Sequence, residues 1–185
     1  MPSAKSSVTE QRLNDLIARG GISNVDTVVP DVTVNGTNKA LGVYTITGGS
    51  ISGDGTEHFV GDACGTFTTP ATAPTAAQFV VFMDGVGSGT IANFGFPAAW
   101  LANNLTGAGW SVHFDLYWTS LSRVVCDIKV WWHNASGGVG AVHSFTVQSL
   151  TGVDTSSDKD LTLAFQWTGN GNTLKTEAVH IRRVA

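Results

Sequence analysis

The sequence predicts an all-β fold: an antiparallel β-sandwich of the jelly-roll type, preceded by an N-terminal arm and one short helix. Three observations lead to this prediction. From residue 22 onward, apolar and polar side chains alternate with a period of two, and β-branched residues are frequent. Clusters of Gly, Pro and Asp separate these runs, and no helical pattern lies between them. Aromatic residues recur on one side of the runs, as expected where two sheets face each other about 10 Å apart.

The composition is typical of one folded domain with a weakly charged surface. The chain has 185 residues, of which 42% are hydrophobic and 13% charged, and its formal net charge is −4. That length is sufficient to bury a core without disulfides or metals. The apolar content excludes an ordinary disordered segment. No run reaches the roughly 18 apolar residues of a membrane helix, and the negative charge disfavours duplex nucleic acid. We therefore expect neither a membrane nor a nucleic-acid partner.

The first 21 residues predict an arm that carries one short helix. The sequence Ser7-Val8-Thr9-Glu10 fits a capping box at the helix start, and Gly20-Gly21 ends the helix. The larger apolar side chains between Ser7 and Gly20 are Val8, Leu13, Leu16 and Ile17. Because a helix of about 13 residues is marginal on its own in water, these side chains need a surface to pack on. We expect residues 1–21 to serve attachment or oligomerisation and residues 22–185 to form the β domain.

Six runs in the first half of the β domain predict strands. They span residues 25–34, 41–47, 57–60, 65–69, 78–83 and 90–96. The run at 78–83 is nearly all apolar, which is typical of a strand covered on both faces. Pro30 interrupts the first run, and two prolines mark residues 69–75 as a loop.

The second half predicts a short crossing followed by longer strands. Residues 96–101 are expected to form a short helical or irregular crossing. Strands are expected at 110–119, 124–133, 141–148, 161–168 and 174–184. Residues 137–140 predict a turn, and residues 154–160 predict a polar loop. The run Gly-Asn-Gly-Asn at 169–172 predicts a β-hairpin between the last two strands.

The histidines do not predict a metal site. They are His58, His113, His133, His143 and His180. No two of them share the HxH or HxxxH spacing of metal ligands, and a lone histidine in a strand is more often a surface or packed residue. We therefore expect neither a metal nor a cofactor.

The carboxylates and the glycine motifs do not predict a catalytic centre. Asp115 and Asp127 lie within strands, opposite the larger apolar row, so we expect them to mark the solvent face. Asp54, Asp62 and Asp84 lie near glycines, but their spacing does not match a calcium-binding EF-hand loop. The sequence contains no GxSxG elbow and no P-loop. We expect no enzymatic activity.

The cysteines and the N-terminus give expectations about the thiols and about the compartment in which the chain is assembled. Cys64 and Cys126 lie far apart without a CxxC motif, and we expect both to be buried thiols. The N-terminus lacks the apolar core of a secretory signal, which predicts that the chain stays or assembles in a cytosol.

Adjacent aromatic residues predict an exposed aromatic surface. Trp131 and Trp132 are neighbours, so in a strand one faces the core and the other faces outward. The same argument applies to Tyr117 beside Trp118. Our candidates for an exposed aromatic interface are Tyr117, Trp131 and Trp132. We favour a subunit interface for them, because oligomers cover weakly charged, apolar surfaces. A carbohydrate-binding platform and simple edge packing stay open.

The C-terminal half carries a succession of motifs built on aromatic residues. They are FPAAW at 96–100, YW at 117–118, VWW at 130–132, DLTLAFQW at 160–167 and NTL at 172–174. This succession resembles a β-sandwich domain of structural proteins in tailed bacteriophages, which occurs in capsid decoration proteins, head fibres and tail-fibre ends. The motifs are structural aromatics and contain no catalytic signature.

The resemblance implies a virion protein that is assembled in the host cytoplasm. Such domains are typically trimeric, and an N-terminal segment attaches them to the particle. Because this chain is short beside a tail fibre, the resemblance favours a trimeric capsid decoration or cement protein. Its partners would be the major capsid protein or other virion proteins.

Three other functions stay open at this point. A receptor- or glycan-binding head of a short tail or head fibre would use the exposed aromatics. The shell protein of a small icosahedral virus would carry a basic arm, whereas residues 1–21 contain only Lys5, Arg12 and Arg19. An enzyme would need a carboxylate pair that only folding could bring together.

Overall fold

The computed structural model describes residues 31–32, 38–84, 89–132, 141–169 and 171–184. The predicted arm and helix at residues 1–21 lie outside the described residues. The role expected for Val8, Leu13, Leu16 and Ile17 therefore stays a prediction. Among the residues that are described, no helix has the length and apolar character needed to cross a membrane.

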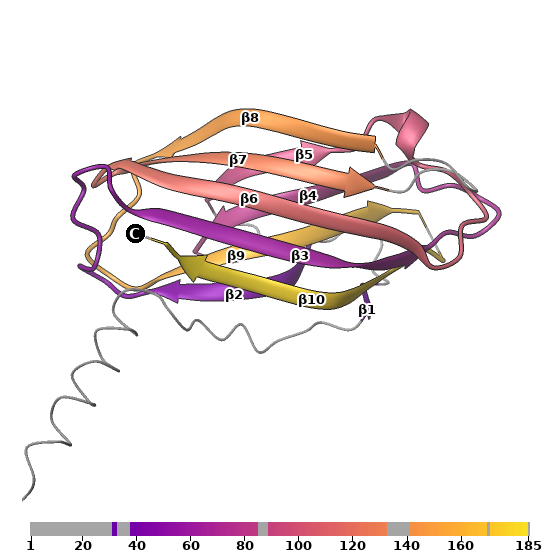
Figure 1. Cartoon of the computed structure of the whole chain (residues 1–185), viewed down its shortest axis with the longest axis horizontal. Coiled ribbons are helices and arrows are strands. Elements are labelled where there is room, and N and C mark those ends of the chain that lie inside the picture. Colours follow the sequence, from indigo (N-terminus) through magenta and orange to yellow (C-terminus); the bar gives the residue numbers. More distant parts are fainter. Residues whose placement is uncertain (1–30, 33–37, 85–88, 133–140, 170, 185) are drawn as a thin grey trace, which may run out of the picture.

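Two antiparallel sheets face each other across one core (Figure 1). The six-stranded sheet consists, in spatial order, of β1 (Asp31–Val32), β10 (Thr173–Arg183), β3 (His58–Thr68), β6 (Ala108–Ser120), β7 (Arg123–Trp132) and β8 (Ala141–Thr151). The four-stranded sheet consists of β2 (Lys39–Ile46), β9 (Lys159–Thr168), β4 (Ala76–Met83) and β5 (Thr90–Gly95). The predicted antiparallel sandwich is confirmed.

The strand order is that of a jelly roll with one extension. Without β7 and β8, the two sheets read β1-β10-β3-β6 and β2-β9-β4-β5. The chain therefore passes repeatedly from one sheet to the other, as in the eight-stranded double Greek key. Strands β7 and β8 extend the edge beyond β6, so the six-stranded sheet presents the broader outer face.

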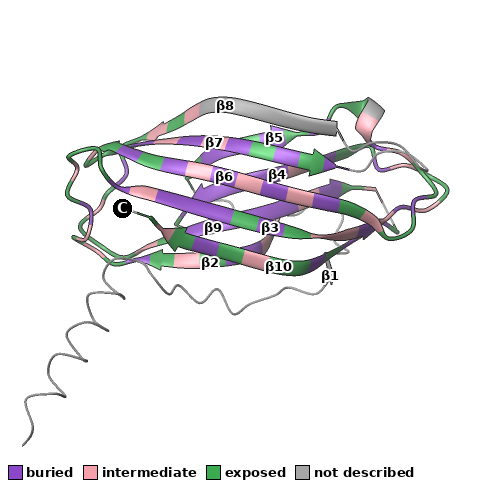
Figure 2. Cartoon of the chain, viewed as in Figure 1, coloured by how far each residue is buried: buried purple, intermediate pink, exposed green. Residues whose placement is uncertain are grey.

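The core is built from the inward rows of both sheets, and aromatic residues dominate it. Along β6 and β7 the burial alternates residue by residue, with Trp110, Trp118 and Trp132 turned inward (Figure 2). The Trp132 ring stacks on Phe67 from β3 at a centroid distance of 3.8 Å. Aromatic rings contribute large buried areas, and contacts of this kind add about 0.5–1.5 kcal/mol each. The aromatic residues of the succession at 96–167 thus serve mainly the interior.

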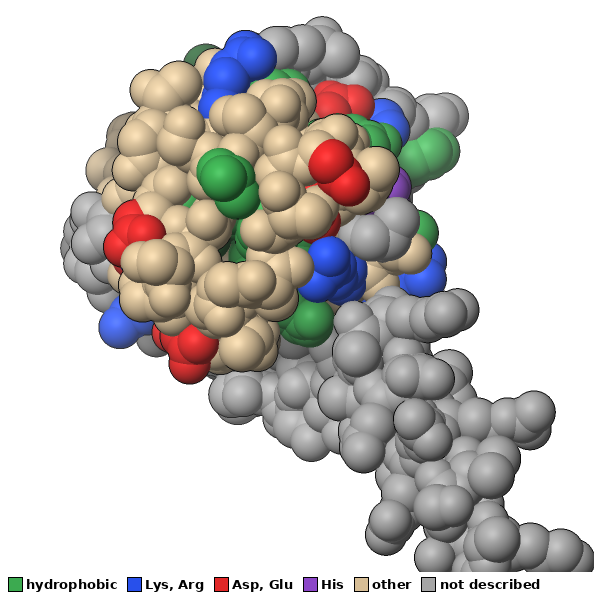
Figure 3. Space-filling model, turned by 90° about the vertical axis from the view of Figure 1, so that its left-hand side faces the viewer, with side chains coloured by type: hydrophobic (Ala, Val, Ile, Leu, Met, Phe, Trp, Pro, Cys, Tyr) green, Lys and Arg blue, Asp and Glu red, His purple; other side chains and the backbone are tan. Residues whose placement is uncertain are grey.

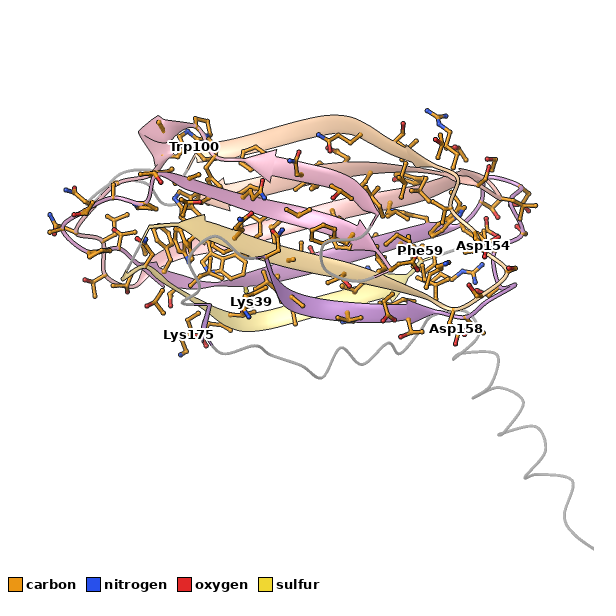
Figure 4. All side chains as sticks on the ribbon, turned by 180° about the vertical axis from the view of Figure 1, so that it is seen from behind. Lys39, Phe59, Trp100, Asp154, Asp158 and Lys175 are labelled. Carbon is orange, nitrogen blue, oxygen red and sulfur yellow. The ribbon has the colours of Figure 1, made fainter. Side chains whose placement is uncertain are left out.

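A short 3-10 turn, η1 (Ala98–Trp100), carries the chain from β5 in one sheet to β6 in the other. It lies at the end of the sandwich opposite the loop of Asp154 and Asp158 (Figure 4). The helical or irregular crossing predicted for residues 96–101 is confirmed. The Trp132 indole N–H on β7 donates to the carbonyl oxygen of Trp100 at 3.0 Å and so ties the end of the turn to the six-stranded sheet.

The prediction of two short strands at 57–60 and 65–69 is wrong, because both belong to the continuous strand β3. The prediction ended the first strand at residue 60 and began the second at residue 65. Gly61 instead lies directly opposite Phe114 on β6, and the Phe114 ring occupies the space that a side chain at position 61 would take. The glycine therefore makes room for a core ring and does not end the strand.

The hairpin predicted at 169–172 is also wrong. Strand β9 is hydrogen-bonded to β2 and β4, whereas β10 is bonded to β1 and β3 in the opposite sheet. The turn thus crosses between the sheets. Gly169 and Gly171 have positive φ angles of 128° and 77°, so the glycines form a tight turn, as expected. This turn connects strands of different sheets and not two neighbours in one sheet.

The described surface is weakly charged and carries a few large apolar side chains. The end view in Figure 3 shows mainly uncharged polar side chains and backbone, with scattered acidic and basic groups. The exposed large hydrophobic residues of the described part of the chain are Val43, Tyr117, Leu121, Trp131 and Val184. They lie on β2, β6 and β7, in the turn after β6 and directly after β10.

We expect Gly61→Ala to destabilise the fold by about 1–3 kcal/mol, because the added methyl group collides with the buried Phe114 ring. The control is Gly109→Ala on the adjacent strand β6, where an added Cβ meets no atom within 4 Å. Urea unfolding monitored by circular dichroism measures both free energies of unfolding. Equal stability of the two variants would contradict this account of β3.

Candidate functional site

The outer face of the six-stranded sheet brings polar side chains from four strands together. This face is turned toward the viewer in Figure 1. The strand register aligns its outward residues in rows across β10, β3, β6 and β7. The first row is Ala178, Cys64, Ser111 and Trp131. The second row is His180, Asp62, His113 and Lys129.

These two rows line a surface pocket of about 380 Å³, which we call the Trp131 pocket. Its hollow follows from the sizes of the side chains, because Ala178, Cys64 and Ser111 are small and neighbour one another. Trp131 stands at the β7 end of this row and is 50% exposed. The second row adds charged and polar groups along one side. The volume lies in the range of pockets that hold small ligands.

A hydrogen-bonded cluster of aspartate, histidine and lysine side chains continues from the pocket. Asp115 is its centre: Oδ2 accepts from His113 Nε2 at 2.9 Å and from Lys129 Nζ at 3.3 Å, and Oδ1 lies 2.9 Å from His58 Nε2. On its other side, His113 Nδ1 donates to Asp62 Oδ1 at 2.7 Å. We call Asp62, His113, Asp115, His58 and Lys129 the Asp115 cluster.

The contacts within the cluster favour the charged forms of its side chains. Partial burial by itself lowers the pKa of His113, but its hydrogen bonds to Asp62 and Asp115 outweigh this effect and raise the pKa. Burial raises the pKa of Asp115, but hydrogen bonds donated by the two histidines and Lys129 lower it below its usual range. Burial by itself lowers the pKa of Lys129, but its contacts with Asp115 and Asp127 together outweigh this effect and raise the pKa.

This arrangement holds charges in place and leaves His113 a poor general base. Both imidazole nitrogens already face carboxylates, so neither can take a proton from Ser111 or Cys64 in the row beside it. Within the described part of the chain, no group of three or more His, Cys, Asp or Glu side chains is placed to hold a metal ion. The exposed polar groups of these rows can form hydrogen bonds with a ligand.

The expectation for the aspartates is confirmed, and so is the exposure of Tyr117 and of one member of the pair Trp131 and Trp132, whereas their role as an interface stays a prediction. Asp115 and Asp127 lie on the outer face, as predicted. Trp131 is exposed, and Tyr117 is 42% exposed and stacks on His58 at 4.2 Å. Trp132 was wrongly placed among the exposed candidates: it is 1% exposed, because its position on β7 points into the aromatic core.

The two cysteines differ, contrary to the expectation that both are buried. Cys126 lies in the core, and burial raises the pKa of its thiol. Cys64 is exposed and lines the Trp131 pocket, because it shares the outward side of β3 with Asp62. The reactivity of the Cys64 thiol therefore depends on access to the pocket, and that of the Cys126 thiol depends on opening of the core.

Sequence reasoning missed the Asp115 cluster. Its signal was present, since polar residues at 113, 115, 127 and 129 alternate with the apolar rows. That pattern places each residue on the outer face but does not say which strands are neighbours. The contacts of Asp62 and His58 with these residues depend on the pairing of β3 with β6.

Comparisons with known proteins identify no family. No protein-family model matches the chain, and no curated protein is significantly similar in sequence. Among solved structures, a polysaccharide lyase family 18 protein, aly-SJ02 r-CATD, is similar at a TM-score of 0.38 and 11% identity, covering 89% of this chain and 92% of that one.

Two structures of infectious bursal disease virus are also similar. The Gx strain structure has a TM-score of 0.27 and 11% identity, and the VP2 subviral particle has a TM-score of 0.24 and 13% identity. Each covers 83% of this chain, which spans 38% of either viral chain. Similarity at this level assigns no activity to this chain.

We expect the His113 imidazole to titrate above its ordinary pKa of about 6.5. Its contribution to stability is then fully present below pH 6.5 and is lost as the pH rises through the raised value. The contribution of Asp115, whose pKa is lowered, is present above about pH 3.9 and is lost in stronger acid. The free-energy difference between wild type and His113→Gln should therefore shrink above pH 6.5.

Two-dimensional NMR of the histidine side chains and urea unfolding across pH 4–9 measure these effects. Asp62→Asn should lower the pKa of His113, because it removes the partner of Nδ1. Asp154→Asn, in an exposed loop, is the control and should leave it unchanged. A His113 pKa at or below 6.5 in wild type contradicts the proposed balance of burial and hydrogen bonding.

We also expect one thiol of the native chain to react rapidly with a soluble disulfide reagent and the second to react only on unfolding. Cys64 is exposed and Cys126 is fully buried. Absorbance of the released thiolate gives the number of reactive groups. Cys64→Ser should abolish the rapid reaction, whereas Cys126→Ser should retain it.

Proposed function

We propose that this chain is a non-enzymatic structural protein of a virion, and specifically a trimeric capsid decoration or cement protein of a tailed bacteriophage. The observation that carries the proposal is the location of the aromatic succession. Its residues Phe96, Trp118, Trp132, Phe165 and Trp167 are buried and belong to one core cluster. In this proposal, the resemblance to that class of protein concerns the interior of the scaffold.

The surface chemistry supports a non-catalytic role. The most prominent polar cluster is bonded within itself, and its histidine has both nitrogens engaged by carboxylates. Asp115, which could otherwise act as a base, accepts from His58, His113 and Lys129. Such a cluster stabilises neighbouring strands by charge-assisted hydrogen bonds.

The proposed mechanism is stabilisation by selective binding. A protein that binds only the assembled shell lowers the free energy of that state by mass action. An interface of about 800 Å² per partner is sufficient for specific attachment. We assign attachment to residues 1–21, whose apolar side chains need a partner surface, and we assign the sandwich to the exterior.

We expect deletion of residues 1–21 to leave a folded β domain that no longer binds particles. The measurement is co-sedimentation with heads purified without this protein, with circular dichroism to confirm the fold. Asp154→Asn in the full chain is the control and should bind heads normally, because this residue lies in an exposed loop of the β domain. Wild-type affinity of the truncated protein would refute the assignment.

A second candidate function is a receptor- or glycan-binding head of a short tail or head fibre. One specific observation favours it: a half-exposed tryptophan stands beside a pocket with hydrogen-bonding groups from four strands. The two functions are separable by experiment, because attachment concerns residues 1–21 and recognition concerns the outer sheet face.

A further inference from the structure

We propose that the Trp131 pocket binds one pyranose ring of a neutral saccharide, with the ring face packed against the Trp131 indole. The inference deepens the glycan-binding candidate and rests on it, and it does not depend on particle attachment. It goes further in naming the site, the chemical class of ligand and the groups that contact it.

The shape of the pocket suits a flat ring bound along its face. Ala178, Cys64 and Ser111 form a floor of small side chains across three adjacent strands. Trp131 rises at one end of that floor and is half exposed. A hexopyranose with equatorial substituents presents C–H groups on its ring faces, and these pack against an indole while the hydroxyl groups point sideways. Burying that apolar surface is the main source of affinity.

The second row supplies partners for the hydroxyl groups. Asp62 has a 56% exposed carboxylate, so it can accept from a saccharide hydroxyl while keeping its bond to His113. Lys129 is 46% exposed and lies on the same strand as Trp131, two residues away. The Ser111 hydroxyl can donate as well as accept. A hydroxyl-rich ligand therefore finds donors and acceptors around the apolar surface.

The charges of the site favour a neutral sugar over an acidic one. Lys129 already contacts the carboxylates of Asp115 and Asp127, and His113 contacts those of Asp62 and Asp115. A sugar carboxylate would compete with these partners for the same cations and would meet the exposed Asp62 carboxylate at close range. Hydroxyl groups carry no such cost.

Tyr117 provides a matched comparison on the same face. It is exposed to a similar degree as Trp131, but it stacks on His58 and does not line the pocket. If any exposed aromatic ring on this sheet sufficed for binding, Tyr117 and Trp131 would be equivalent. The inference requires that they differ.

The test is calorimetric titration of the full chain with methyl β-galactoside, methyl β-glucoside and glucuronic acid. We expect a dissociation constant in the millimolar range for at least one neutral glycoside, at least tenfold weaker binding in Trp131→Ala, and unchanged binding in Tyr117→Ala. The same glycoside should slow the reaction of Cys64 with a thiol reagent, because the thiol lies on the pocket floor. Circular dichroism verifies the fold of each variant.

The other outcomes overturn the inference in distinguishable ways. Saccharide binding that survives Trp131→Ala and does not protect Cys64 places the glycan site elsewhere and leaves the glycan-binding candidate intact. No binding by any of the three sugars removes both the site and that candidate, without touching particle attachment. Tighter binding of glucuronic acid than of either neutral glycoside contradicts the charge argument. If Trp131→Ala instead dissociates an oligomer in sedimentation, the pocket belongs to a subunit interface.

Discussion

The fold and its candidate site both depend on the inward orientation of the aromatic rows. Because a strand alternates with a period of two, placing Trp110, Trp118 and Trp132 in the core forces the intervening residues of β6 and β7 outward. A shift of one residue would bury His113 and Asp115 and expose the tryptophans. The large burial energy of the rings thus fixes the register, and the register assembles the polar rows.

The Asp115 cluster is a consequence of that register and also a constraint on it. It links β3, β6 and β7 through side chains that lie opposite one another on the outer face. Asp115 is stabilised as an anion because three donors surround it, and each donor is held by a strand whose other side is in the core. The cluster is therefore preorganised, and ordering it requires little further loss of entropy.

The two proposals assign different tasks to different parts of one chain. Attachment would use the N-terminal segment, which is rich in small polar residues and for which the sequence predicts a short helix with apolar side chains. Recognition would use the broad outer sheet, where β7 and β8 extend the jelly roll and add Trp131 and Lys129 to the face. A weakly charged scaffold with one small polar and aromatic pocket suits selective recognition better than a broad electrostatic field does.

The sequence by itself determined the all-β class, the positions of most strands and the side of each strand that faces the core, because alternation is a local property. It did not determine that residues 58–68 are one strand, since the reason for Gly61 is a ring on β6. The hairpin predicted after β9 and the burial predicted for Cys64 were both wrong. Only the tertiary structure decided which strands are neighbours, and therefore that Asp62, His113 and Lys129 share one row beside Trp131. Such pairing depends on contacts between residues far apart in the chain, which no local pattern records.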